Sequence, residues 1–496
     1  MKLWTLLSFV AAYQQVLLAE SNILVVFPHV YYSHFKETAR LVSKIGTYGY
    51  NVTFVTPFPT QLENAHQGIT EISIEGIVEP LKDYVANFYQ TENTWYSYWS
   101  HLKYTKDIGY EYAQKVLENE NVTKLISSSS QFDLVIIEDV SADALTILSH
   151  IFKCPLVVLL SEPLGIFYDN YVTDITPWKQ YNEIRSMHHW AFKELFRELN
   201  TLPAQNRLAR KFLPSAPDLR NIMYDTSLVL MPSYEILTYL VPKYPHVKQI
   251  GGFNRAESNK PEIEAENASA SLVVVSKNIP SYIFEKLLDI PSLKFIYTSQ
   301  VSDVIRQERV DLLIGDGDVY DIASAMARRV KVLIISRNYW HQSFLIDKLV
   351  DERMALQVSI EDDFKKIVEA VNYLMNDAES VFKVMRAWTL MNIEQPEGDQ
   401  TMGWLEHVLF YKGASHLRPS NLRSSLLHNR ITVIIILIIV DLALFLLFYW
   451  IIIHFHKVLR HAVLKVCGAI RRFIKRRAQP QTTISYIPID EKKFGI

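Results

Sequence analysis

The stretch NILVVFPHVYYSHFKETARLVSKIGTYGYNVTFVTPF, residues 22–58, decides the fold. Two apolar runs, 22–28 and 51–58, enclose a segment whose apolar residues recur at helical spacing. These residues are Phe35, Ala39, Leu41, Val42 and Ile45. Continuous runs of Val, Ile and Leu are typical of strands buried on both faces of a parallel sheet. The stretch therefore predicts a βαβ unit.

The same alternation of short apolar runs and helical patterns continues along the chain. Further strands are predicted at 132–139, 154–161, 227–233, 271–276, 292–299, 310–315 and 330–336. The polar segment 254–266 has the composition of a linker. We therefore expect an α/β protein with two doubly wound, Rossmann-like domains, 20–250 and 251–430. Such a pair places a ligand cleft between the domains, at the carboxyl ends of the strands.

Both ends of the chain indicate a membrane protein. Residues 1–19 combine Lys2, an apolar run and a small residue at Ala19, a pattern typical of a signal peptide. Residues 431–453 are apolar except for Asp441 and are long enough to span a bilayer. The tail, 454–496, is rich in Lys and Arg. The positive-inside rule places it in the cytosol, so we expect a single-pass type I protein with a lumenal body.

Composition excludes several classes of protein. The chain has 496 residues, 49% of them hydrophobic, which excludes intrinsic disorder. Its two cysteines exclude a disulfide scaffold and a zinc site built from cysteines. The 51 basic and 53 acidic residues indicate no nucleic-acid partner. The basic tail either lies against anionic lipid or serves only to stop transfer across the membrane, and the sequence leaves both readings open.

Three sequons for N-glycosylation lie in the predicted lumenal body, at Asn51, Asn121 and Asn267. Asn51 begins a predicted strand, whereas the other two lie in polar stretches. We therefore expect a glycoprotein.

Candidate acid–base residues follow two of the predicted strands. His29 and His34 come directly after the first strand, and Glu138 and Asp139 end the strand 132–139. An imidazole at one strand end and a carboxylate at another could form a general base with its orienting acid. The same residues could equally be a surface histidine and a helix-capping acid. The spacing alone leaves both interpretations open.

Several stretches resemble the animal UDP-glycosyltransferases, especially those of insects, over nearly the whole chain. They are ILVVFPHVYYSHF, GYNVTFVTPFP, FDLVIIEDVSADAL, SLVLMPSYEILTYLVPKYPHVKQIGGF and WLEHVLFYKGASHLR. The resemblance implies a GT-B fold with the acceptor in the first domain and a UDP-sugar in the second. It also implies that His34 is the general base and Glu138 its partner acid, with Asp139 and Asp143 as alternatives.

The resemblance further implies the substrates and the location. The acceptor is a small lipophilic hydroxylated molecule, the UDP-sugar is a co-substrate, and neither a cofactor nor a metal is needed. The protein is expected in the endoplasmic reticulum membrane, with the plasma membrane as an alternative. The resemblance also allows association into homo-oligomers, or into hetero-oligomers with other family members.

The donor half of the chain departs from the family pattern. Thr298 stands where the uracil-stacking Trp is expected, and Asp316, Gly317 and Asp318 stand where the diphosphate-binding His-Gly-Gly is expected. Ser324 replaces the ribose-binding Glu. The sugar-binding Asp-Gln pair falls on His341 and Gln342. Only Gly317 and Gln342 agree with the pattern, and the domain is about one strand–helix unit short.

These departures predict weak binding of a nucleotide sugar. The family binds the diphosphate at a helix N-terminus, where Asp316 and Asp318 would add negative charge. Two functions therefore stay open. The chain either transfers a hexosyl group from a UDP-sugar, or it is a catalytically silent member that binds ligands or partners active glycosyltransferases.

Overall fold

The structure is a computed structural model. It describes residues 21–29, 32–58, 68–78, 95–160, 192, 194–231, 244–250, 271–336, 343–376, 383–384, 398–418 and 422–477. The predicted signal peptide 1–19, the predicted linker 254–266 and the tail beyond residue 477 lie outside the described residues. Residues 1–428 form one compact unit and residues 429–496 a second.

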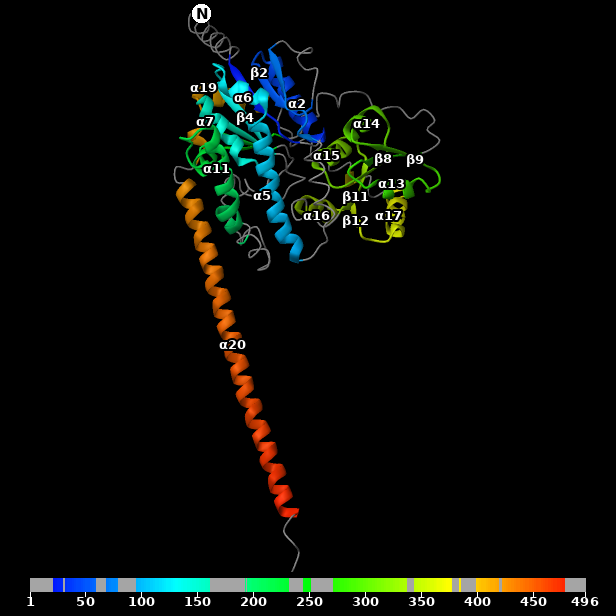
Figure 1. Ribbon diagram of the computed structural model, residues 1–496. Coiled ribbons are helices and arrows are strands. Elements are labelled where there is room, and N and C mark those ends of the chain that lie inside the picture. Colours follow the sequence, from blue (N-terminus) through cyan, green and yellow to red (C-terminus); the bar gives the residue numbers. More distant parts are fainter. Residues whose placement is uncertain are drawn as a thin grey trace, which may run out of the picture. The chain divides into compact units, whose positions relative to one another are not determined.

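The described residues of the first unit contain two parallel sheets (Figure 1). The first sheet has seven strands in the order β3-β2-β1-β4-β5-β6-β7. Their bounds are Asn22–Val26 (β1), Asn51–Thr56 (β2), Ile69–Ser73 (β3), Leu134–Asp139 (β4), Leu156–Leu160 (β5), Leu228–Met231 (β6) and Val247–Gln249 (β7). The βαβ unit predicted from residues 22–58 is present, since β1 and β2 pair in parallel around helix α2 (Tyr32–Thr47).

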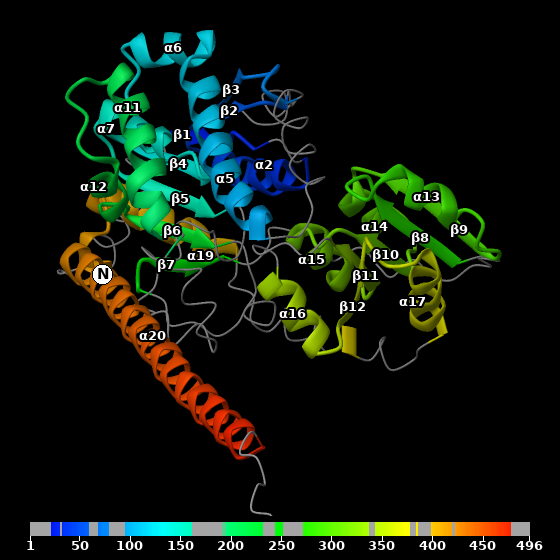
Figure 2. The ribbon, with the colours of Figure 1, turned by 60° about the horizontal axis from the view of Figure 1, so that its bottom comes forward.

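Helices cover both faces of this sheet because alternate side chains of each buried strand point to opposite faces. Leu24 and Val26 of β1 face helices on one side, whereas Ile23 and Val25 face α2 on the other. The helices of the first side are α5 (Trp95–Leu117), α6 (Glu120–Ser127), η1 (Asp143–Thr146), α7 (Ile147–Phe152), α11 (Leu202–Phe212) and α12 (Leu219–Tyr224). Figure 2 shows α5 and α11 crossing this face.

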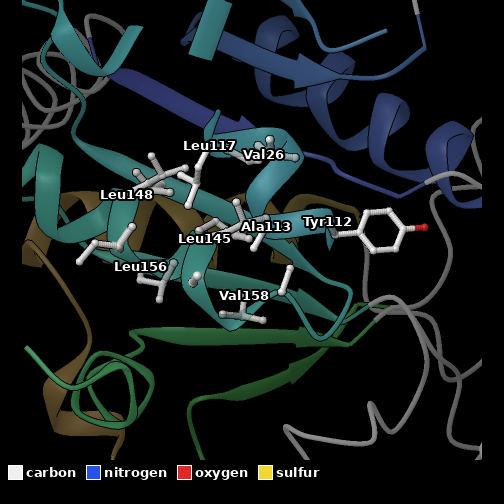
Figure 3. Packing of buried hydrophobic residues seen from close by; sticks show 14 of the residues in the cluster. Val26, Tyr112, Ala113, Leu117, Leu145, Leu148, Leu156 and Val158 are labelled. Carbon is white, nitrogen blue, oxygen red and sulfur yellow. The ribbon is translucent and has the colours of Figure 1, made fainter. Parts of the chain in front are cut away.

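The core on the first side joins strands to helices far apart in sequence. Figure 3 shows Tyr112, Ala113 and Leu117 of α5 packed with residues of the strands and of η1 and α7. Leu145 and Leu148 are at most 1% exposed. Each fully buried side chain of this size stabilises the fold by about 1.5–3 kcal/mol.

The second sheet has five strands in the order β12-β11-β10-β8-β9. Their bounds are Ser271–Ser276 (β8), Leu293–Thr298 (β9), Leu312–Gly315 (β10), Lys331–Ser336 (β11) and Ala355–Ser359 (β12). One face is covered by α14 (Val301–Gln307), α15 (Val319–Ala327) and α16 (Ser343–Asp351). The other is covered by α13 (Ser281–Leu287) and α17 (Phe364–Asn376). The predicted fold class, two doubly wound α/β sheets, is confirmed.

The strand order reverses once in each sheet. In the first sheet β1 separates β2 from β4, and in the second β8 separates β9 from β10. Ligands of doubly wound folds bind at such switch points, beyond the carboxyl ends of the strands. The segments after β1, β4 and β10 are therefore the places to look for a site.

Helix α19 (Gly398–Tyr411) packs on the first sheet, although it follows the second sheet in sequence. Met402, Leu405 and Val408 are at most 1% exposed and belong to the core that contains α2. The Lys248 ammonium lies 3.5 Å from the ring centroid of Trp404, a cation–π contact between β7 and α19. The predicted second domain, 251–430, thus includes a helix buried against the first sheet.

Helix α20 (Leu422–Arg477) contains the apolar run predicted to span a membrane. Its portion Ile434–Arg477 is long and apolar enough to cross a bilayer, with a mean hydropathy of 2.9 over its most apolar window. Most of the large apolar side chains of this portion are exposed, which suits contact with lipid, whereas Leu437 is buried.

Candidate active site

His34 lies in the first turn of α2, directly beyond β1. Its neighbour Phe35 fixes this turn by packing in an aromatic cluster. The Phe35 ring centroid lies 5.8 Å from that of Phe27, 6.3 Å from Phe54 and 5.1 Å from Phe58. Aromatic contacts of this kind contribute on the order of 1 kcal/mol each beyond burial. The start of α2, and His34 with it, is therefore held firmly against the strand ends.

Glu138 lies in β4, beside the carboxyl end of β1. The backbone after β4 is held by Gln205 of α11, which accepts a hydrogen bond from the Ala144 amide at 3.0 Å and donates one to the Ser141 carbonyl at 3.2 Å. Gly109 allows α5 to approach the same segment, since a Cβ there would lie 2.1 Å from the Ser141 oxygen. The strand end that carries Glu138 is thus rigidly supported.

The structure brings His34 and Glu138 together. The Nδ1 atom of His34 lies 3.6 Å from Oε1 of Glu138, and the two residues are 6% and 2% exposed. Neither oxygen of Glu138 has a hydrogen-bond partner among the described residues. Burial raises the pKa of this carboxyl group, while the imidazole opposes the rise. A buried carboxylate in this place can orient the imidazole and balance a charge on it.

A second carboxylate meets the other nitrogen of His34. Asp318 immediately precedes α15, and its Oδ2 lies 3.6 Å from Nε2 of His34. Asp318 is itself buried, at 7% exposure. His34 therefore lies between two carboxylates, that of Glu138 in the first sheet and that of Asp318, which follows β10 of the second sheet.

Two rings close the remaining sides of the imidazole. His29 stacks on His34 with the ring centroids 4.2 Å apart and the planes 7° apart. Tyr320 of α15 contacts it edge-on, with the centroids 4.6 Å apart. An acceptor hydroxyl has no free approach to the imidazole while these neighbours stay in place.

The two carboxylates control the protonation of His34. Burial disfavours its charge, but the contacts with Asp318 and Glu138 outweigh burial and raise its pKa to about 10. The imidazole is therefore protonated at neutral pH. His29 behaves oppositely, since burial and the neighbouring His34 charge lower its pKa well below the ordinary value.

The two alternative acids lie apart from this pair. Asp139 accepts a hydrogen bond from the Ser141 amide at 2.9 Å. Asp143 pairs with Arg197, whose Nη2 lies 3.3 Å from Oδ2 of Asp143. Burial raises the pKa of Asp143, and Arg197 opposes this rise. Among the carboxylates of the first sheet that the structure describes, Glu138 is the one placed 3.6 Å from the imidazole of His34.

The residues predicted for the donor side cluster at the ends of β9 and β10. Thr298 ends β9. After β10, Gly317 has φ of +105°, a left-handed conformation that favours glycine. Burial and the nearby Asp318 raise the pKa of Asp316 to about 6. Ser324 is buried in α15. Gln342 and His341 lie outside the described residues.

The sequence analysis missed the role of two residues. It placed Asp318 in a diphosphate loop, but the contact of Asp318 with His34 joins residues 284 positions apart in the chain, and no sequence pattern signals it. Tyr320 was not singled out from the sequence, yet its ring packs on His34. Among the described residues, no group of three or more His, Cys, Asp or Glu could hold a metal ion.

Two of the three sequons can be located. Asn51 is exposed at the start of β2, where its Nδ2 donates to Oδ1 of Asn22 at 3.3 Å. Asn121 is exposed in the first turn of α6, and its Nδ2 donates to the Ser73 carbonyl at 3.0 Å. Asn267 lies outside the described residues.

Solved glycosyltransferase structures share the fold of this chain. The structure resembles the glycosyltransferase of kitacinnamycin with a TM-score of 0.52 and 13% identity, over 78% of this chain and 99% of that one. It resembles CalG4, the calicheamicin glycosyltransferase, with a TM-score of 0.51 and 13% identity, over 78% of this chain and 99% of that one. The two sheets therefore form a GT-B glycosyltransferase fold.

Sequence comparison finds similar proteins in an insect. The chain is 22% identical to the UDP-glycosyltransferase UGT4 of Dactylopius coccus over 454 residues, which cover 80% of this chain and 88% of that one. It is 22% identical to UDP-glucosyltransferase 2 of the same insect over 458 residues, which cover 82% of this chain and 88% of that one. No family model matches. The predicted resemblance is confirmed: the chain is similar to insect UDP-glycosyltransferases over most of its length.

Proposed function

We propose that this chain is a membrane-anchored glycosyltransferase that moves a hexosyl group from a UDP-sugar to a hydroxyl of a small lipophilic acceptor. The observation that carries the proposal is the buried pair of His34 and Glu138 at the switch point of the first sheet. The named activities of the insect relatives support the same reaction.

The residues present suit a displacement at the anomeric carbon. The acceptor oxygen forms a bond to that carbon as the bond to the UDP oxygen breaks and UDP leaves with the electron pair. The acceptor proton passes to Nε2 of His34, and Glu138 balances the resulting imidazolium. This step requires a neutral imidazole, so the Asp318 carboxylate must first move away from Nε2.

Replacement of the base tests this reaction. His34→Ala should lower the rate of transfer by about 10²- to 10⁴-fold, the usual contribution of a general base. The full chain in detergent would be assayed with labelled UDP-sugars and a panel of phenols and aliphatic alcohols.

His29→Ala should lower this rate by about tenfold at most, because a stacked ring pair contributes on the order of 1 kcal/mol. The exposed His150 on α7 offers a matched control, and His150→Ala should leave the rate unchanged. Equal rates for wild type and His34→Ala would refute the assignment of the base.

A second function has its own supporting observation. The donor side carries Thr298, Asp316 and Ser324 in place of the family's donor residues, and Asp318 blocks the imidazole. These features favour a catalytically silent member that binds small molecules or associates with active glycosyltransferases, as a homo- or hetero-oligomer. Absence of transfer by wild type with every UDP-sugar, together with co-purification of an active family member, would favour this function.

We propose the endoplasmic reticulum membrane as the location, with the body lumenal and the tail cytosolic. The support is the apolar portion of α20 and the eight basic residues between Lys457 and Arg477. In sealed microsomes, protease should leave residues from about 20 to 430 intact and should digest the chain beyond Ile453. Protection of a C-terminal epitope tag, with loss of the body, would overturn the type I topology.

A further inference from the structure

Asp318 fills an anion-binding position with its own side chain. Its Oδ1 accepts hydrogen bonds from the amides of Tyr320 at 2.9 Å and Asp321 at 3.1 Å. These are amides of the first turn of α15, the kind of donors that a helix N-terminus offers to a phosphate. The left-handed Gly317 turns the backbone so that the carboxylate reaches them. The first turn is thus occupied by a negative group of the chain itself.

The other oxygen of Asp318 faces the protonated imidazole of His34, which follows the first strand of the first sheet. Oδ2 faces Nε2 of His34 at 3.6 Å, and Glu138 faces Nδ1 at the same distance. Among the described residues, His29, Tyr320 and the carboxyl of Asp321 also lie near the imidazole. Burial raises the pKa of Asp321 well above its ordinary value. One carboxylate thereby satisfies a helix N-terminus and neutralises the imidazolium.

A second ion pair joins the same two parts. Lys36 of α2, two residues after His34, pairs with Asp303 of α14. Asp303 also accepts a hydrogen bond from Arg306 at 3.0 Å. Helix α2 therefore contacts both helices that follow β9 and β10.

We propose that Asp318 is an internal anion that takes the place of a donor diphosphate at α15 and locks His34 in its protonated state. The inference rests on the proposed function. We call this placement of the Asp318 carboxylate the lock, because it would exclude both a donor diphosphate from α15 and a neutral imidazole at His34. A diphosphate reaches the α15 amides only by displacing the Asp318 carboxylate, and His34 loses its proton only when that carboxylate leaves. One movement of Asp318 therefore opens both sites.

Two substitutions separate the two contacts. Asp318→Asn keeps a side-chain oxygen for the helix cap, because Asn caps helices as well as Asp, but removes the charge that faces His34. Asp318→Gly removes both contacts and costs the helix only a few tenths of a kcal/mol relative to a good cap. Asp303→Asn is the matched control, since it breaks the other ion pair without touching His34 or the cap of α15.

The titration of His34 is the first measurement. Deuterium exchange at the histidine C2 position, followed by mass spectrometry of the full chain in detergent, reports the titration of each histidine. The midpoint for His34 should fall by about one to three pH units in Asp318→Asn, the usual effect of losing an opposite charge at this distance. It should stay unchanged in Asp303→Asn. An unchanged midpoint in Asp318→Asn would overturn the lock.

Binding of UDP by calorimetry is the second measurement. Asp318→Gly should bind UDP at least about tenfold more tightly than wild type, because two amide donors become available to the diphosphate. Asp318→Asn should gain less, since its side chain still holds the amides. Equal affinity in wild type and Asp318→Gly would overturn the internal-anion assignment.

The outcomes distinguish the lock from the proposed function. If His34 titrates as expected and UDP binding improves, but no variant transfers sugar, the lock stands and the proposed function fails. If wild type transfers sugar through His34 and the Asp318 variants change neither titration nor binding, the function stands and the lock is wrong.

Discussion

Asp143→Ala should destabilise the protein by about 3 kcal/mol, the lower end of the usual cost of breaking a buried ion pair, because Arg197 keeps a second carboxylate, that of Glu198. Arg197 and Asp143 are 1% and 3% exposed. After the substitution the guanidinium keeps its contact with Glu198, whose Oε1 lies 3.5 Å from Nη1, but it loses the buried charge that faces Nη2. Arg197 also contacts Sδ of Met223 at 3.5 Å, which places the guanidinium among apolar side chains. Urea unfolding of the full chain in detergent, followed by tryptophan fluorescence, measures the loss.

The same substitution separates a structural acid from a catalytic one. Replacing both charges, as Asp143→Leu with Arg197→Met, should restore most of the stability, because apolar residues of similar size remove the cost of burying charge. If Asp143 were instead the partner acid of the base, Asp143→Ala would abolish transfer without changing stability. That result would contradict the assignment of Glu138.

Restoring the family residues on the donor side should have the second large effect. The combined variant Thr298→Trp, Asp316→His, Asp318→Gly and Ser324→Glu should bind UDP about three orders of magnitude more tightly than wild type. Removal of the Asp316 charge contributes on the order of 3 kcal/mol at about 5 Å and an effective dielectric near 20. A ring that stacks on uracil contributes roughly 1–3 kcal/mol more.

Thermal stabilisation by UDP would show this gain. A competent site gains about 2.7 kcal/mol at a ligand concentration of 100 times the dissociation constant. Thr298→Ala, which adds no ring, is the matched control and should bind no better than wild type. Tight binding of UDP by wild type would show that the donor-side residues have been assigned wrongly.

Four of the strands that sequence reasoning found share one property. β1, β4, β5 and β8 are runs of Val, Ile and Leu, and their interior residues are almost wholly buried. Continuous apolar runs are therefore a direct signal of a parallel sheet covered on both faces.

The strands that it missed lack this signal. β3 reads ITEIS, with a charged residue at its centre, and lies at the edge of the first sheet. β7 has only three residues and lies at the opposite edge. β12 reads ALQVS and is an edge strand of the second sheet. An edge strand has one neighbour and exposed side chains, so its pattern resembles that of a loop.

The sequence by itself determined the strand–helix order and placed His34 and Glu138 at neighbouring strand ends. These predictions follow from local patterns, because each apolar run marks a strand and parallel strands bring their carboxyl ends to one edge of the sheet. That β1 and β4 are neighbours, although β2 and β3 lie between them in sequence, is shown by the sheet topology.

Only the tertiary structure decided that α19 packs on the first sheet and that Asp318 meets His34. Each of these contacts joins segments from different parts of the chain, and their formation depends on how two separately formed sheets pack. The protonation of His34 follows from the same packing, since it depends on a carboxylate that no local pattern brings near the imidazole.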